Sequence, residues 1–150
     1  MLLLLFQTQD NRFALDCRRV VEVVPWLAVK KLPKSPDYVQ GIVNYRGTPV
    51  PVIDLCHLLN SSSCGLSLST RIILINYPHR DANSRTIGLL AERVTETVTT
   101  PPDWTPPLAA TSWDSLYIEA TVVKKSSLVR WFDPEAILPD DLATFIFREM

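Results

Sequence analysis

The chain has 150 residues, of which 47% are hydrophobic and 21% charged, and its 15 Lys and Arg nearly balance its 16 Asp and Glu. This composition excludes disorder for most of the chain and predicts one domain, or two small ones that share a core. It also lacks the basic excess that sequence-independent binding to nucleic acid requires. Because three cysteines is an odd number, we expect no full disulfide framework and a reducing cytosol.

The chain begins with an apolar run from Met1 to Leu5. The run stops at Gln7, has no basic flank and is far shorter than the ~18 residues of a membrane-spanning helix. We therefore predict a buried first strand and expect no direct membrane insertion.

Short runs rich in β-branched residues follow, each bounded by Pro, Gly, Asn or Asp, which is the pattern of β-strands. They lie at 20–24, 42–43, 50–53, 71–75 and 95–100. Pro49 and Pro51 bracket Val50, which predicts an edge strand or a bulge at that point. Many short strands with little glycine predict an all-β fold built of small barrels or a sandwich.

Helix signals are few. Asp54 precedes Leu55, Leu58 and Leu59, and Asp133-Pro134-Glu135 precedes Ile137 and Leu138; each pattern predicts a single capped helical turn. Helical spacing near the end of the chain predicts a short amphipathic C-terminal helix from Leu142, Phe145, Ile146 and Met150. The serine-rich segment 60–69 predicts a flexible loop. The proline-rich segment 101–107 predicts an extended loop held against its own domain, with an SH3 ligand as the alternative.

Two parts of the chain resemble each other, which predicts an internal repeat. The block 13–24 matches 87–98, and the block 38–59 matches 117–138 without gaps, with tyrosine at 38 and 117 and aspartate at 54 and 133. Proline-rich connectors separate the blocks in both halves. Each unit is too small to bury its apolar face alone. We therefore predict a single domain, 1–150, in which two related β-units, 13–59 and 87–138, pack around one core.

Residues that could carry catalysis are scarce. His79 lies in a polar loop and is expected to face solvent. Cys56, His57 and Cys64 do not have a recognised zinc spacing, so we expect no metal site. Asp54 and His57 could form an acid/base pair, although Asp54 is better explained as a helix cap. Because no phosphate-binding, dinucleotide-binding or nucleophile motif occurs, we predict a protein that is not an enzyme and has no cofactor.

The segment from Gly41 to Leu55 carries the strongest local signal. It predicts a strand, a tight polar turn at 44–47, a second strand and a capped helical turn, because Asn and Gly favour hairpin reversals. Arg46 stands at this turn between two apolar strands. Its guanidinium must therefore find a partner or remain in solvent.

This segment resembles the hallmark of CheW-like chemotaxis adaptor domains, a Gly-hydrophobic-hydrophobic-Asn-x-Arg-Gly run followed by Pro-Val-hydrophobic-Asp-Leu. Flanking segments at 13–24, 32–39, 87–94 and 128–138 match the same family, so the resemblance covers nearly the whole chain. It implies a fold of two small five-stranded SH3-like β-barrels around a common core, which agrees with the repeat.

The resemblance also implies a non-enzymatic adaptor. Such a protein couples the cytoplasmic tips of methyl-accepting chemoreceptors to the regulatory domain of a CheA-type histidine kinase. Five positions match family positions associated with partner contacts or with the architecture that supports them: Val20, Glu22, Asn44, Arg46 and Gly47. We accordingly expect a cytoplasmic protein that is recruited to membrane receptor arrays and has no nucleic-acid partner.

The chain departs from the family pattern at two places, which bear on partner specificity. Residues 117–120 read Tyr-Ile-Glu-Ala where members often have Tyr-Ile-x-Gly, and Glu92 stands near a position where Asp is common. A small β-barrel that binds nucleic acid or oligosaccharide is the alternative function. The neutral charge and the lack of an aromatic-plus-basic cluster argue against it. A hydrolase using Asp54 and His57 is a third, weaker hypothesis.

Glu22 interrupts a run of four valines on a predicted strand, whose alternation places it on one face with Val20 and Val24. A carboxylate at that position needs water or a cation, because burying it unpaired would cost several kcal/mol. Arg46 is the candidate cation. We predict that Glu22 and Arg46 pair and order the 44–47 turn, with separate solvation of both as the alternative.

Overall fold

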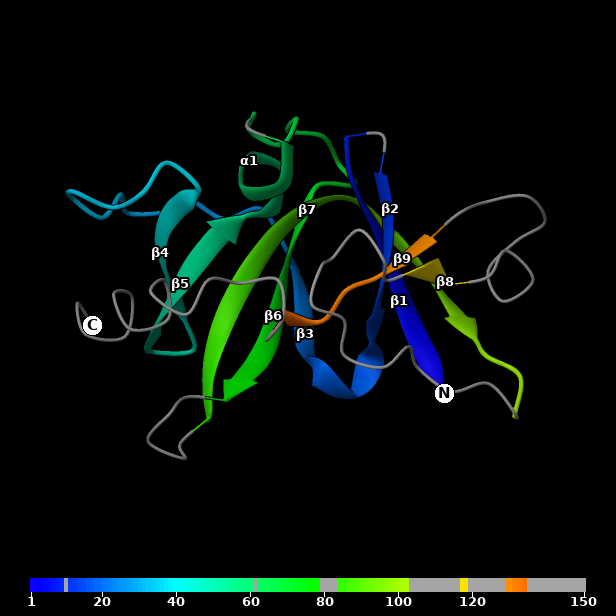
Figure 1. Ribbon diagram of the computed structural model, residues 1–150. Helices are drawn as coiled ribbons and strands as arrows, with labels where there is room; N and C mark the ends of the chain where they lie inside the picture. Colours follow the sequence, from blue (N-terminus) through cyan, green and yellow to red (C-terminus); the bar gives the residue numbers. More distant parts are fainter. Residues whose placement is uncertain (10, 61, 79–83, 103–116, 119–128, 135–150) are drawn as a thin grey trace.

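The computed structural model describes residues 1–9, 11–60, 62–78, 84–102, 117–118 and 129–134 (Figure 1). These residues are mostly β-strand, as predicted, with one short α-helix among them. The elements are β1 (Leu2–Thr8), β2 (Asn11–Asp16), a 3-10 turn (Cys17–Arg19), β3 (Val20–Pro25), β4 (Val39–Tyr45), β5 (Thr48–Asp54), α1 (Leu55–Asn60), β6 (Arg71–Pro78), β7 (Ser84–Thr99), β8 (Tyr117–Ile118) and β9 (Val129–Trp131). The predicted C-terminal helix, His79 and most of the 101–107 segment lie outside the described residues. Within the described segments, no helix has the length and apolarity to cross a membrane.

The long strand β7 belongs to two sets of strands. Its first half pairs antiparallel with β6 and parallel with β5, which gives a first set in the order β3-β6-β7-β5-β4. Its second half pairs antiparallel with β1, which gives a second set in the order β7-β1-β2-β9-β8. In Figure 1, β4 and β5 lie on the left, β1, β2, β8 and β9 lie on the right, and β7 passes between them.

Within the described residues, the chain crosses between the two sets at two short irregular points. The first is the 3-10 turn after β2, which Asp16 caps because its Oδ1 accepts a hydrogen bond from the Arg18 N–H at 2.9 Å. The second is a bulge in the middle of β7, where Arg93 has a left-handed φ of 49° and the register against β1 shifts. A bulge bends a strand, which lets one strand serve both sets.

The parallel pairs of the two sets occupy matching positions in the sequence repeat. Val52 of β5 pairs with Gly88 of β7, and Trp131 of β9 pairs with Ala14 of β2. The repeat aligns Val52 with Trp131 and Ala14 with Gly88. The same contact therefore occurs once in each set, between residues that the repeat treats as equivalent.

The gapless match of 38–59 with 117–138 is wrong at its start. Val43 pairs with Val50 in the first set, whereas Ile118 pairs with Val129 in the second. Six residues separate the first pair and ten separate the second. Because the repeat aligns Val50 with Val129, their strand partners Val43 and Ile118 are equivalent, whereas the gapless match aligns Ile118 with Val39. More residues therefore lie between the paired strands in the second set than in the first, a difference that a gapless comparison cannot detect.

The largest buried cluster draws on both sets. Phe6, Phe13 and Phe132 of the second set contact one another, with ring centroids 5.5–6.0 Å apart, and belong to the same cluster as Ile53 and Leu89 of the first set. The first strand is buried as predicted, with Leu3, Leu4, Leu5 and Phe6 at most 7% exposed. Shared burial of this kind ties the two sets together through the hydrophobic effect.

Candidate functional site

The predicted turn at 44–47 is a two-residue β-hairpin turn between β4 and β5. Tyr45 pairs with Thr48, and both residues between them are left-handed, with φ of 51° at Arg46 and 82° at Gly47. Two successive positive φ values are the mark of a type I′ turn, which matches the twist of the flanking strands. Asn44 orders the turn, because its Oδ1 accepts a hydrogen bond from the Gly47 N–H at 2.8 Å.

Glu22 of β3 meets this turn through two contacts. Arg46 donates from Nη2 to Glu22 Oε2 at 3.4 Å, which confirms the predicted ion pair. The Tyr45 hydroxyl donates to the same carboxylate oxygen. This hydrogen bond is the main reason that the pKa of Tyr45 is raised above its ordinary value. The Arg46 guanidinium also lies over the Tyr45 ring, 5.2 Å from its centroid, which is a cation–π geometry.

Tyr45 is the residue that reasoning from the sequence missed. It lies inside the hallmark run, between Asn44 and Arg46, and packs partly against the buried cluster of the first set. Its position next to a turn arginine was the available signal, because an aromatic ring can hold a guanidinium in place.

Val20 does not join the other four predicted residues. It packs with Val23 against the large shared cluster, whereas Val24 belongs to the separate cluster of the first set. The pairing of β3 with β6 is irregular between Val20 and Glu22. This bulge interrupts the strand alternation, so the prediction that Val20, Glu22 and Val24 share one face is wrong at Val20.

A groove runs beside the hairpin. It has a volume of about 220 Å³ and is lined by Lys30, Ile42, Val43, Asn44, Gly47 and Pro49. Its wall is formed where the connector after β3 meets β4 through two hydrogen bonds of 2.8 Å between the backbones of Lys30 and Ile42. Gly41 makes this approach possible, because a Cβ there would lie 2.5 Å from the Lys30 carbonyl oxygen.

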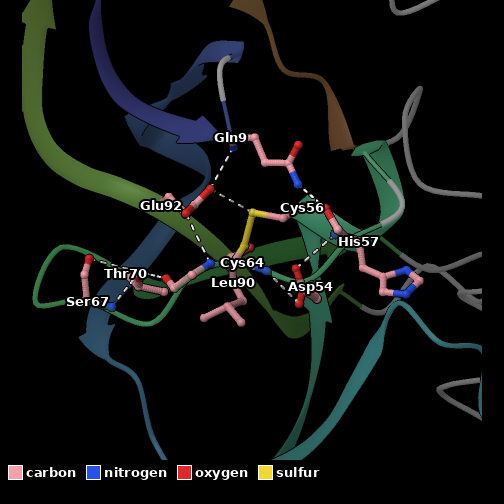
Figure 2. Close-up of a disulfide and its surroundings, with 11 residues drawn as sticks. Gln9, Asp54, Cys56, His57, Cys64, Ser67, Thr70, Leu90 and Glu92 are labelled. Atoms are coloured by element: carbon pink, nitrogen blue, oxygen red, sulfur yellow. Dashed lines mark hydrogen bonds between the residues drawn. A yellow bond between two sulfur atoms is a disulfide. The ribbon is translucent and has the colours of Figure 1, made fainter.

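Asp54 is a helix cap, as predicted. It is 1% exposed, its Oδ1 accepts from the His57 N–H at 3.1 Å, and its Oδ2 accepts from the Cys64 N–H at 3.3 Å. Burial raises the pKa of Asp54, and the backbone hydrogen bonds oppose that rise. The His57 ring points away from the Asp54 carboxylate (Figure 2), so the two side chains do not form the acid/base pair considered above.

Cys56 and Cys64 form a disulfide (Figure 2). We expected no full disulfide framework, and the sequence did not indicate this single pair. It forms because the segment after α1 folds back onto Asp54 and β7 and brings the two sulfurs together. Asp54, Cys56 and Cys64 are also the described residues whose donor atoms could hold a metal. The disulfide occupies both sulfurs, and backbone N–H groups occupy both Asp54 oxygens. Cys17 stays a free thiol, whose pKa is raised by burial.

Comparison with known proteins relates this chain to one family and to several of its named members. A family model described as the CheW-like domain matches residues 2–142. The chemotaxis protein CheW of Rhizobium meliloti and that of Bacillus subtilis are each 28% identical over 97 residues, covering 65% of this chain and 59% of theirs. Protein FrzA of Myxococcus xanthus is 28% identical over 69 residues, 46% of this chain and 43% of FrzA. The chain thus aligns with 43–59% of the length of these relatives.

A solved structure shows the same fold. The scaffolding protein TtCheW from Thermoanaerobacter tengcongensis superposes with a TM-score of 0.67 over 88% of this chain and 83% of that one, at 24% identity. The chain belongs to the CheW-like domain family.

Proposed function

We propose that this chain is an adaptor that couples the cytoplasmic tips of methyl-accepting chemoreceptors to the regulatory domain of a CheA-type histidine kinase. Family membership and the names of the chemotaxis relatives support this role. The protein would work in the cytoplasm, at receptor arrays, through protein–protein contacts alone.

We also propose that the chain is a single domain, 1–150, in which each set of strands closes as a small five-stranded SH3-like barrel. In the first set, β3 and β4 are the two ends of the strand order, and Glu22 connects them through Tyr45 and Arg46. The matching parallel registers of the two sets support an arrangement of two related units.

The observation that carries the proposed function is that the Arg46 side chain is both exposed and held in place. Its side chain is 76% exposed, yet it is held by an ion pair, a cation–π contact and a fixed turn. An exposed arginine that is already ordered loses less conformational entropy when it binds a carboxylate or a carbonyl group of a partner. Glu22, Asn44, Arg46 and Gly47 therefore form our proposed contact surface, which continues into the groove beside the hairpin.

The test is calorimetric titration of the protein with the kinase regulatory domain and, separately, with a receptor tip fragment from the same genome. Arg46→Asn should weaken binding to at least one of them by about tenfold, which corresponds to about 1.4 kcal/mol. Arg18→Asn is a matched control, because the Arg18 side chain is 77% exposed and also pairs with a carboxylate, that of Asp16. Unchanged affinity of the Arg46 variant for both partners would contradict the proposal.

A further inference from the structure

The Cys56–Cys64 disulfide joins α1 to the segment 62–70, which folds over the middle of β7. Both cysteines belong to the buried cluster of the first set, together with Val43 and Leu90. Cys56 is fully buried and Cys64 is 7% exposed.

Each sulfur lies next to a hydrogen-bond acceptor that a thiol could use (Figure 2). Cys56 Sγ is 3.4 Å from Glu92 Oε1, and Cys64 Sγ is 3.5 Å from the Leu90 carbonyl oxygen. A thiol is a weak donor, whereas a disulfide sulfur has no hydrogen to donate. Breaking the disulfide would therefore leave two thiols, each with a hydrogen-bond acceptor close by.

The segment 62–70 is also held by contacts that do not depend on the disulfide. The Cys64 N–H donates to Asp54 Oδ2, the Gly65 N–H donates to Glu92 Oε2 at 3.1 Å, and the Val94 N–H donates to the Ser69 carbonyl at 3.1 Å. These backbone bonds would keep the two sulfurs near each other after reduction. A dithiol that stays preorganised can form its disulfide again without refolding.

We propose that Cys56 and Cys64 are a reversible redox site that exchanges with low-molecular-weight disulfides of the glutathione class. The Cys64 thiolate attacks one sulfur of the external disulfide, forming a mixed disulfide and releasing one external thiol. The Cys56 thiolate then attacks the Cys64 sulfur, closing the protein disulfide and releasing the second thiol. The two protein thiols together lose two electrons and two protons, which the external disulfide gains. This site is independent of the proposed adaptor function.

The chemical test uses the full chain carrying Cys17→Ser, so that only the two cysteines of the site remain. The protein is equilibrated in glutathione buffers from reducing to oxidising and quenched with acid. It is then unfolded in denaturant, labelled with a maleimide near neutral pH and weighed by mass spectrometry. We expect both thiols to become protected together within the range of these buffers, and to return on addition of dithiothreitol. When Cys64→Ser is added, Cys56 should not become glutathionylated in any of the buffers, because it is fully buried.

The second readout is thermal unfolding of the same Cys17→Ser protein in its two redox states. The oxidised form should melt about 5–10 °C above the reduced form, because the cross-link limits the unfolded chain. Thiols that stay free in the most oxidising buffer would overturn the proposal. So would a disulfide that persists in the most reducing glutathione buffer, which would make it a permanent cross-link. Stoichiometric zinc that is bound by the reduced protein and lost in Cys64→Ser would identify a metal site instead.

Discussion

Glu22 and Arg46 form an ion pair, with 3.4 Å between Glu22 Oε2 and Arg46 Nη2, that links the two end strands of the first set. β3 and β4 are not hydrogen-bonded neighbours in the described strand order, so this side-chain contact, with that of Tyr45, bridges the set where backbone pairing ends. The turn that carries Arg46 is thereby held to a strand that precedes it by more than twenty residues.

The turn should tolerate loss of the Arg46 side chain if the new residue accepts a left-handed backbone. We expect Arg46→Asn to keep the free energy of unfolding within about 1 kcal/mol of the parent, because Asn adopts positive φ readily and an exposed ion pair contributes only about 0–1 kcal/mol. Arg46→Val should lower it by about 1–3 kcal/mol, because a β-branched residue is disfavoured there. Urea denaturation measures both. Equal effects of Asn and Val would show that backbone conformation is not what limits this position.

Tyr45 should titrate at a higher pH than an exposed tyrosine, because its hydroxyl donates to Glu22. Since its pKa is raised in the folded state, Tyr45 stabilises the fold below the ordinary tyrosine pKa of about 10, and this contribution is lost as the pH rises through the folded value. Ultraviolet titration should show one of the four tyrosines shifting back toward the ordinary value in Glu22→Gln. Identical titration curves for parent and variant would rule out the hydrogen bond.

Asp54 combines a cap with a buried charge, and two variants separate these effects. Asp54→Ala should lower the free energy of unfolding by about 1–3 kcal/mol, because the His57 and Cys64 N–H groups lose their acceptor. Asp54→Asn keeps an acceptor for the cap and removes the charge.

The sign of the pH effect follows from the raised pKa of Asp54. Its protonated form favours the fold at low pH, and this contribution is lost as the pH rises above the unfolded value, near 4, and through the folded pKa. The stability of Asp54→Asn relative to the parent should therefore increase from pH 4 to pH 7. A relative stability that falls over this range would contradict the assignment.

Glu92 holds two segments, one at Gln9 and one at Gly65, beside the bulge in the middle of β7. Its Oε1 accepts from the Gln9 N–H at 2.7 Å and its Oε2 accepts from the Gly65 N–H at 3.1 Å. Glu92→Ala should cost about 1–3 kcal/mol of unfolding free energy, because two backbone donors lose a charged acceptor. Glu96→Ala is the matched control on the same strand. Its ion pair with Arg12 is partly exposed, so we expect the variant to cost less than about 1 kcal/mol. Similar costs for the two variants would show that Glu92 does not hold these segments.

Features set by local chemistry were predictable from the sequence. The Asp54 cap depends on a few neighbouring residues, and the hairpin turn depends on Asn44 and Gly47 within one short run. The Glu22–Arg46 pair was also predictable, because a carboxylate among valines needs water or a cation and a turn arginine was available.

Features that depend on how distant segments meet could not be predicted in the same way. The Val20 side chain does not lie on the strand face that simple alternation predicts, because a bulge follows it. That bulge arises from the pairing of β3 with β6. The Cys56–Cys64 bond depends on the path of the segment between them, which local propensity does not specify. The equivalence of Ile118 with Val43 depends on which residues pair across the strands, and a gapless comparison does not contain that information.

The Glu22–Arg46 pair is proposed to present a surface that binds a signalling partner. The most direct measurement is a double-mutant cycle on the affinity for the CheA-type kinase domain and for the receptor tip, using Arg46→Glu, Glu22→Arg and the two together. We expect Arg46→Glu to weaken binding by about tenfold or more, and the double variant to recover part of that loss, with circular dichroism showing an intact fold in each. A coupling free energy indistinguishable from zero, with both single variants binding both partners as the parent does, would contradict the account.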